Sequence, residues 1–106
     1  MDKVKDVYLA CGATDLRKSI DGLALIVETQ LKKDSYQNAL FVFGNKAMNR
    51  LKVLHFDEGF WLYYYRLDNG KLKWPQNKDE AIKINKEELK WLLKGYEIRT
   101  ISKFKF

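Results

Sequence analysis

The chain has 106 residues, the size of one domain, and 46% of them are hydrophobic, which is typical of a globular protein. A single cysteine, Cys11, allows no internal disulfide and no cysteine-rich metal site, and no apolar run reaches the ~18 residues of a membrane span. The N-terminus also lacks the apolar core of a signal peptide. These features predict one cytoplasmic domain over residues 1–106, with no membrane association.

The net charge of +6 is distributed unevenly along the chain. Residues 1–70 contain 10 Lys and Arg against 9 Asp and Glu, whereas residues 71–106 contain 10 against 5. An excess of positive charge in one part of a chain indicates nucleic acid or another polyanion as a partner. Lysines that only solvate the surface would give the same excess, so charge alone leaves both interpretations open.

The first predicted elements are a short strand and a helix. The apolar residues 7–10 indicate a strand, which Cys11 and Gly12 close. Thr14 or Asp15 is then suited to cap a helix. An apolar stripe at the helical period follows, and it consists of Leu16, Ile20, Leu23, Ala24, Val27 and Leu31. We therefore expect a helix from about residue 15 to about residue 31.

Residues 39–75 contain four apolar runs separated by turn residues. The separators are residues 44–45, 57–59 and 69–70, and the last of these is Asn-Gly, the strongest short-range signal for a hairpin. The runs are rich in Phe, Tyr, Trp, Val and Leu, which suit a pleated and half-buried surface. This stretch predicts a meander of four consecutive antiparallel strands.

The length of each hairpin loop predicts the register of the meander. A three-residue loop at 57–59 places Arg50 opposite Arg66 and Lys52 opposite Tyr64, and directly opposed residues share a face. One face is then a core face, and it contains Leu51, Val53, His55, Trp61, Tyr63, Tyr65, Leu67, Leu72 and Trp74.

The other face of the meander has a basic end. A two-residue loop at 69–70 would place Arg66 opposite Lys73 and extend this end onto the fourth strand. The predicted nucleic-acid contacts are Arg50, Lys52, Tyr64, Arg66, Lys71 and Lys73, with Arg17 and Lys18 from the first helix. Lys and Arg neutralise phosphate and an aromatic ring can stack on a base, so we expect DNA as the partner.

The same face has an apolar end, which contains Leu54, Phe56, Phe60 and Leu62. An uncovered patch of this size marks a partner surface or an oligomer interface. Alternatively, the N-terminal strand or the C-terminal tail folds over the patch. The sequence leaves these two interpretations open.

The end of the chain predicts a strand, a helix and a tail. Residues 81–84 alternate as a strand does, Asn85 and Glu88 form a capping-box pattern, and Gly95 suits the end of the helix. The basic tail at 97–106 is either an added strand or a frayed end. The predicted fold class is α+β, an antiparallel meander of four to five strands with two helices packed on one face.

Catalytic chemistry finds little support in the sequence. The single histidine, His55, falls on the predicted core face, where a buried imidazole is expected. The acidic residues are scattered over turns and helix starts, and neither a zinc-binding spacing nor a phosphate-binding loop is present. We therefore expect a protein that is not an enzyme and that needs no metal or other cofactor.

Several short motifs occur in a specific order, at residues 7–12, 14–23, 39–43, 50–54, 59–62, 66–67 and 73–75. In this order the chain resembles the small accessory protein, called TnpB, of the bacterial insertion-sequence family numbered sixty-six. The resemblance implies a role in transposition beside a separate and much larger transposase that carries the catalytic acidic residues. Two functions fit this role: a DNA-associated helper, or an interaction module that binds the transposase without contacting DNA.

Overall fold

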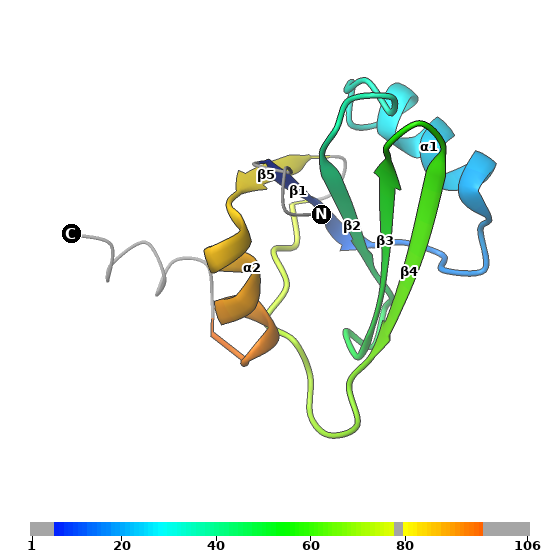
Figure 1. Ribbon diagram of the computed structural model, residues 1–106. Coiled ribbons are helices and arrows are strands. Elements are labelled where there is room, and N and C mark those ends of the chain that lie inside the picture. The colour runs from blue at the N-terminus through cyan, green and yellow to red at the C-terminus, as the bar shows by residue number, and fades with distance from the viewer. Residues whose placement is uncertain (1–5, 78–79, 97–106) are drawn as a thin grey trace.

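The computed structural model describes residues 6–77 and 80–96, which form one sheet and two helices (Figure 1). Along the chain the elements are β1 (Val7–Ala13), α1 (Ile20–Thr29), β2 (Leu40–Gly44), β3 (Arg50–Phe56), β4 (Phe60–Arg66), β5 (Ala81–Ile84) and α2 (Lys86–Leu93). The α+β class is as predicted, and each of the five strands forms where the sequence predicted a strand, although one further predicted strand, at 71–75, does not form. The strand predicted at 81–84 is confirmed as β5.

The sheet is mixed, which corrects the prediction of a purely antiparallel sheet. Its strand order is β4-β3-β2-β1-β5, with β1 parallel to β2 and all other neighbours antiparallel. The cause is the connection through α1, because a helical crossover returns the chain to the same end of the sheet and makes the next strand parallel. The β2 strand therefore lies in the middle of the sheet, and β4 and β5 form its two edges.

The predicted register of the central hairpin is confirmed. In the β3–β4 ladder Arg50 pairs with Arg66 and Lys52 pairs with Tyr64. The loop at 57–59 has the three-residue length that this register requires, and Asp57 N donates to Gly59 O at 2.8 Å. Because one hairpin fixes which side chains share a face, the sorting of β3 and β4 into two faces also holds.

The two helices cover opposite faces of the sheet, which corrects the prediction that both pack on one face. On β2, Phe41 and Phe43 belong to the cluster that contains the buried residues of α1, whereas Leu40 and Val42 belong to the cluster that contains Leu92 of α2. Successive strand residues point to opposite faces, so the helices lie on opposite sides (Figure 1). We call these faces the α1 side and the α2 side.

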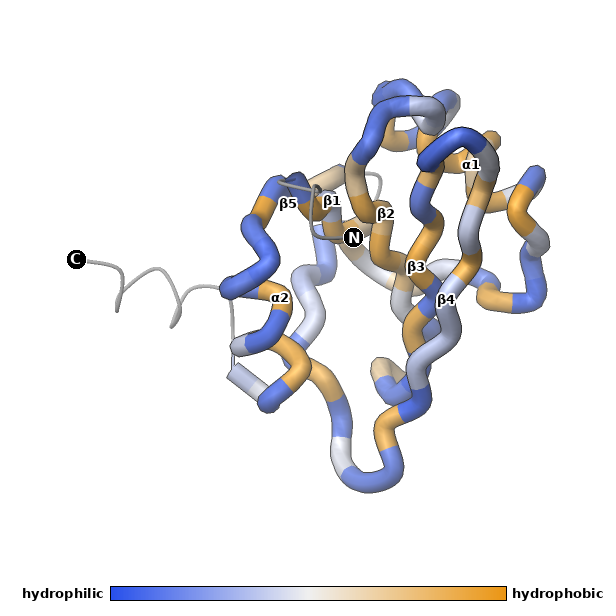
Figure 2. The backbone as a smooth tube through the Cα atoms, in the orientation of Figure 1, coloured by the Kyte–Doolittle hydropathy of each residue, from blue (hydrophilic) through white to orange (hydrophobic). Residues whose placement is uncertain are grey.

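The reason for this arrangement is the apolar character of the central strands. All five residues of β2 are buried, and so are the first six of β1. Figure 2 shows that β2 is mostly hydrophobic. A strand that is apolar on both faces must be covered on both, as in sheets that have helices on either side. The predicted core face on β3 and β4 is therefore only part of the core, and the α1 side contains a second part.

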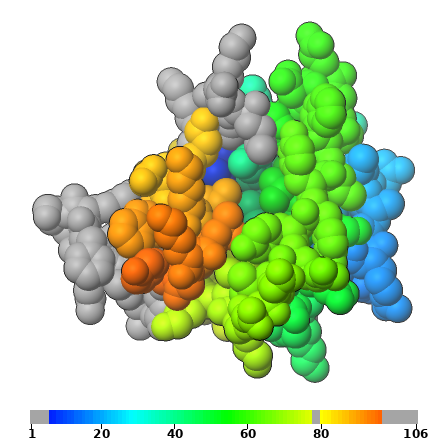
Figure 3. Space-filling model, turned by 60° about the horizontal axis from the view of Figure 1, so that its bottom comes forward, coloured from blue at the N-terminus to red at the C-terminus, as the bar shows by residue number. Residues whose placement is uncertain are grey.

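The fourth strand of the predicted meander does not form. After Gly70 the chain leaves β4 and crosses toward β1, and no strand lies within 71–75. In Figure 3 the first part of this segment, in yellow-green, lies at the surface between β4 and α2. Leu72 and Trp74 are still buried. Two hydrogen bonds attach their segment to the rest of the fold: Leu72 N donates to Met48 O at 2.7 Å, and Trp74 Nε1 donates to Ala10 O at 2.9 Å. Alternation therefore predicted correctly that Leu72 and Trp74 are buried, although it did not predict their hydrogen-bond partners, and it wrongly placed Trp61, which is 56% exposed, in the core.

The two helices begin differently. The first starts at Ile20, after Ser19, and not near residue 15 as predicted, because the Asp15 side chain accepts a hydrogen bond from Arg17 N at 3.0 Å and holds a turn before the helix. The second helix has the predicted capping box, formed by Asn85 and Glu88. The tail predicted at 97–106 lies outside the described residues.

Candidate nucleic-acid interface

The basic end of the β3–β4 hairpin lies on the α1 side, next to the turn that precedes α1. Lys52 and Tyr64 share the face of Leu54, which packs in the α1 cluster. The Lys52 ammonium donates to the backbone carbonyl of Lys18 at 3.2 Å, which connects the strand to the turn. Residues that lie more than 30 positions apart in the sequence are thus brought to one surface.

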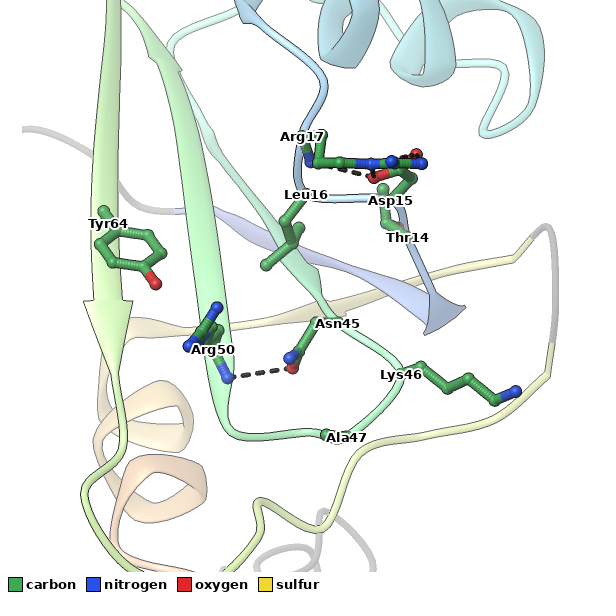
Figure 4. Close-up of a pocket in the computed structure, with 9 residues that line it drawn as sticks. All are labelled: Thr14, Asp15, Leu16, Arg17, Asn45, Lys46, Ala47, Arg50 and Tyr64. Atoms are coloured by element: carbon green, nitrogen blue, oxygen red, sulfur yellow. Dashed lines mark hydrogen bonds and ion pairs between the residues drawn. The ribbon is translucent and has the colours of Figure 1, made fainter.

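This surface contains an open pocket of about 510 Å³ (Figure 4). Three segments line it: the turn before α1, the β2–β3 turn, and the paired ends of β3 and β4. The lining residues are Thr14, Asp15, Leu16, Arg17, Asn45, Lys46, Ala47, Arg50 and Tyr64. In Figure 4 the Tyr64 hydroxyl points toward Arg50, and Leu16 points into the space between Arg50 and the turn, whereas the Lys46 side chain points away. The pocket therefore combines a cation, an exposed phenol ring and an apolar wall.

The position of Arg50 is fixed by Asn45. The Asn45 side-chain oxygen accepts hydrogen bonds from the backbone N–H groups of Asn49 and Arg50, both at 3.0 Å, and its nitrogen donates to Asn49 Oδ1 at 2.8 Å. An asparagine that bonds its own turn is a common way to stiffen a connection. In the sequence Gly44-Asn45 is recognisable only as a turn signal, so the bond from this asparagine to the first residue of β3 was not predicted.

The charge of Arg17 is already paired. Its guanidinium donates to both oxygens of Asp15, with Nε 3.0 Å from Oδ1 and a terminal nitrogen 2.9 Å from Oδ2. The hydrogen bonds from Arg17 lower the pKa of Asp15 to about 2 and raise the pKa of Arg17. Asp15 is therefore ionised at neutral pH, and its carboxylate offsets the attraction of Arg17 for phosphate.

Arg50 and Lys52 differ from Arg17 in this respect. Among the described residues, neither forms an ion pair with a carboxylate, and the neutral carbonyl that Lys52 contacts leaves its charge uncompensated. Tyr64 beside them is 58% exposed, so its ring is open to a partner. Arg66 lies opposite Arg50 and has a loose and exposed contact with Asp68 at 3.9 Å.

The structure does not join Lys71 and Lys73 to this group through strand pairing. Both are exposed, but they lie on the segment that leaves β4, so the predicted pairing of Arg66 with Lys73 is wrong. The physical reason is that a two-residue type I′ turn needs positive φ at both Asn69 and Gly70, and only Gly70, with φ of +79°, has it. The predicted contact residues that the structure brings to one surface are Arg17, Lys18, Arg50, Lys52, Tyr64 and Arg66.

The apolar end of the same face is partly covered by α1 and by the loop that follows it, and the tail that was one of its two predicted covers lies outside the described residues. Leu54 is fully buried, and Phe60 and Leu62 pack against the cluster that α1 completes. The Phe56 ring lies 5.0 Å from that of Phe60 and 5.1 Å from that of Tyr36, which comes from the loop after α1. Because α1 lies on this side of the sheet, Leu54 is buried and Phe56, Phe60 and Leu62 are half-buried.

His55 is buried, as expected, and only one of its ring nitrogens has a partner among the described residues. Its Nε2 lies 2.7 Å from Asn38 Oδ1, while Nδ1 has none. Burial lowers the pKa of His55, which favours the neutral imidazole. Over residues 6–77 and 80–96 no three potential metal ligands are grouped together. In the same part of the chain, no helix has both the length and the apolar character that crossing a bilayer requires.

The fold and this surface define a small, basic α+β domain whose candidate site groups positively charged side chains around an exposed tyrosine. The chain belongs to the family described as IS66 Orf2 like protein, which matches residues 5–103, and its members are insertion-sequence accessory proteins and not the transposase. Two relatives come from Sinorhizobium fredii. Uncharacterized protein y4hO is 38% identical over 94 residues, which cover 88% of this chain and 82% of the relative. Uncharacterized protein y4jC is 32% identical over 92 residues, which cover 86% and 79%. No solved structure matches the chain.

Proposed function

We propose that this protein is a non-enzymatic accessory protein of insertion-sequence transposition that associates with DNA through the basic end of the β3–β4 hairpin. The observation that supports the proposal most is the grouping of Arg50, Lys52 and Arg66 around the exposed ring of Tyr64. Like charges repel at this spacing, so gathering them has a cost that an anionic partner offsets.

The chemistry of each group suits a nucleic acid. An arginine can hold a phosphate through two parallel N–H donors, and Asn45 fixes the backbone from which Arg50 extends. Lys52 adds a point charge on the same face. Tyr64 offers a ring face to an unstacked base or a hydroxyl to a phosphate. None of these contacts requires a defined base sequence, so the proposal is one of backbone binding.

A double substitution tests whether this group acts as an organised site. Arg50→Ala with Arg66→Ala should weaken binding to duplex DNA and lower the slope of log K against log[salt] by about 0.9 for each phosphate that the variant no longer neutralises. Lys90→Ala with Lys94→Ala removes the same formal charge from α2, on the other side of the sheet, and is the matched control. Fluorescence anisotropy over a salt series measures both slopes.

Two results would contradict the proposal. Equal losses from the arginine pair and the lysine pair would mean that net charge alone attracts DNA, and a wild-type protein that does not bind at low salt would mean that there is no direct contact. Because both arginines are exposed, the double variant should keep its fold, since surface changes usually cost within about 0.5 kcal/mol. Circular dichroism of each variant separates loss of binding from loss of structure.

The second function is a module that binds the transposase without contacting DNA, through the apolar end of the hairpin. Leu54 is buried beneath α1, so a partner would have to dock on the half-buried Phe56, Phe60 and Leu62. Co-purification with the transposase of the same element, after nuclease treatment, tests this alternative. A complex that survives nuclease and the Arg50→Ala, Arg66→Ala change, in a protein that does not bind DNA, would favour it over our proposal.

A further inference from the structure

The outer edge of β4 is unused by the proposed function. The strand order places β4 at one edge of the sheet and β5 at the other, and residues 6–77 and 80–96 supply no strand beyond β4. An edge strand presents a row of N–H and C=O groups that can pair with another strand. Natural proteins usually protect such edges with charges, with proline, with bulges or by keeping the strand short.

The two edges of this sheet differ in their protection. The β5 strand has four residues and carries exposed Lys83, which are two of these protective features. The β4 strand has seven residues, contains no lysine or proline, and has one charge, Arg66, at its end. Two of its large side chains are exposed, Trp61 by 56% and Tyr64 by 58%. The β4 edge is therefore long, aromatic and open.

We propose that β4 pairs antiparallel with β4 of a second copy of this chain, so that the two sheets join into one. The strand is self-complementary in this arrangement. Two identical antiparallel strands are related by a two-fold axis perpendicular to the sheet, so side chains on the same side of each copy meet. With the axis at Tyr63, the α2 side pairs Tyr63 with its own copy and Trp61 with Tyr65 of the second copy. Cross-strand aromatic pairs of this kind stabilise sheets.

The α1 side is equally compatible with this pairing. With the same axis, Phe60 lies opposite Arg66 of the second copy, and Leu62 lies opposite Tyr64. A guanidinium over a phenyl ring is favourable, and no two like charges are directly opposed. The free edge of β4 is therefore complementary, in length and in side-chain chemistry, to the same edge of a second copy of the chain.

The pairing also has a consequence for DNA, which rests on the proposed function, whereas the dimer itself does not. Because the two-fold axis is perpendicular to the sheet, the α1 sides of both copies face the same direction. The two basic ends would then lie on one continuous surface, on either side of the axis. A single copy offers half of this surface.

The mass of the protein in solution tests the pairing. Sedimentation equilibrium of the full chain should give about 25 kDa, twice the chain mass of 12.6 kDa. Trp61→Lys introduces a charge at the edge and should give a monomer, while Leu25→Lys, at a residue 61% exposed on α1, should leave the dimer intact. Circular dichroism confirms that each variant is folded. A monomeric wild type, or a dimer that persists in folded Trp61→Lys, would overturn the proposal.

Cysteine cross-linking tests the geometry independently. Tyr63→Cys places a thiol at the two-fold axis and should give a covalent dimer on mild oxidation, whereas Lys83→Cys on the β5 edge should not. The natural Cys11 is buried and serves as the background in both variants. Cross-linking through residue 83 and not through residue 63 would place the interface at β5 and overturn the proposal. DNA binding by a folded Trp61→Lys monomer, measured separately, shows whether the proposed function stands without the dimer.

Discussion

Arg17 and Arg50 illustrate at the scale of single residues why a count of cations is a poor guide to a binding site. Both line the same pocket, but Asp15 neutralises Arg17, and no carboxylate of the described chain neutralises Arg50. The sequence places Asp15 two positions before Arg17, but it does not show that the two side chains meet. Only the turn before α1, held by the Asp15 side chain, brings this pair together.

Removing the Asp15 charge should therefore strengthen DNA binding. Asp15→Asn keeps a side-chain oxygen that can accept from Arg17 N, but it releases the guanidinium and removes a nearby negative charge. If Arg17 then binds a phosphate, the salt slope should increase by about 0.9. Asp21→Asn, an exposed change of the same charge in the first turn of α1, is the control. Equal increases from both changes would show that Arg17 does not reach a phosphate.

His55 should make the stability of the fold sensitive to mild acid. Burial holds its pKa below the ordinary value of 6.5, so the unfolded chain binds a proton first as the pH falls. The free energy of unfolding should then decline below pH 6.5, by at most about 1.4 kcal/mol per pH unit for one proton. His55→Gln removes this titration and keeps an amide donor for Asn38.

Urea unfolding at about pH 7 and about pH 5 measures the effect, because a histidine changes charge in this interval. The wild-type protein should lose more stability over the interval than His55→Gln loses. Parallel losses in the two proteins would mean that other groups cause the decline, and that the buried ring is protonated as easily as an exposed one.

At the scale of elements, the two helices differ in how the free backbone N–H groups of their first turns are hydrogen-bonded. Asn85 accepts from Glu88 N at 2.8 Å, and the Glu88 carboxylate accepts from Asn85 N at 3.1 Å, so both ends of the capping box are formed. Ser19 stands at the same position before α1 and makes no side-chain cap bond. The first helix is therefore held by its packing, which includes Leu23 and Val27.

This difference predicts unequal costs for two similar substitutions. Asn85→Ala should lower the free energy of unfolding by about 1 kcal/mol, since it removes a cap bond at the start of the helix that carries Leu92 into the core. Ser19→Ala should cost much less, because it removes no bond. Urea unfolding of both variants under one set of conditions makes the comparison, and similar costs would contradict it.

Elements also show where prediction from the sequence succeeded and where it failed. The β3–β4 register followed from the length of one loop, and the start of α2 followed from its cap residues, because both are local features. The parallel pairing of β1 with β2 is not local, since a helix separates the strands. A signal for it existed, because residues 39–43 are apolar without alternation, which is typical of a strand covered on both faces.

In the candidate site, too, the features that depend on local sequence were predictable and the features that depend on distant parts of the chain were not. The group of Arg50, Lys52, Tyr64 and Arg66 followed from the register, so the sequence was sufficient for it. The failure of Lys73 to join them, and the place of Asn45 beside them, depend on where the chain goes after Gly70 and on bonds within a turn. The path of the chain after Gly70 depends on tertiary packing, which buries Leu72 and Trp74 against the α2 side.

At the scale of the whole molecule, β1 lies between two strands that the chain supplies much later. Its first residue, Val7, pairs with Leu40 on one side and with Ile84 on the other, and Trp74 donates to Ala10 from the segment between them. Contacts between distant parts of a chain slow folding, because the loop between them must close first. This protein should therefore fold slowly and as one cooperative unit.

A truncation series should show this dependence. A chain that ends at residue 80 lacks β5 and α2, leaves an edge of β1 unpaired and removes Leu92 from the core, so it should give no cooperative urea transition. A chain that ends at residue 96 keeps every described element and should retain the transition. On the ribosome, then, β1 is translated before both of its neighbours, and one of its edges stays unpaired until residues 81–84 have been translated.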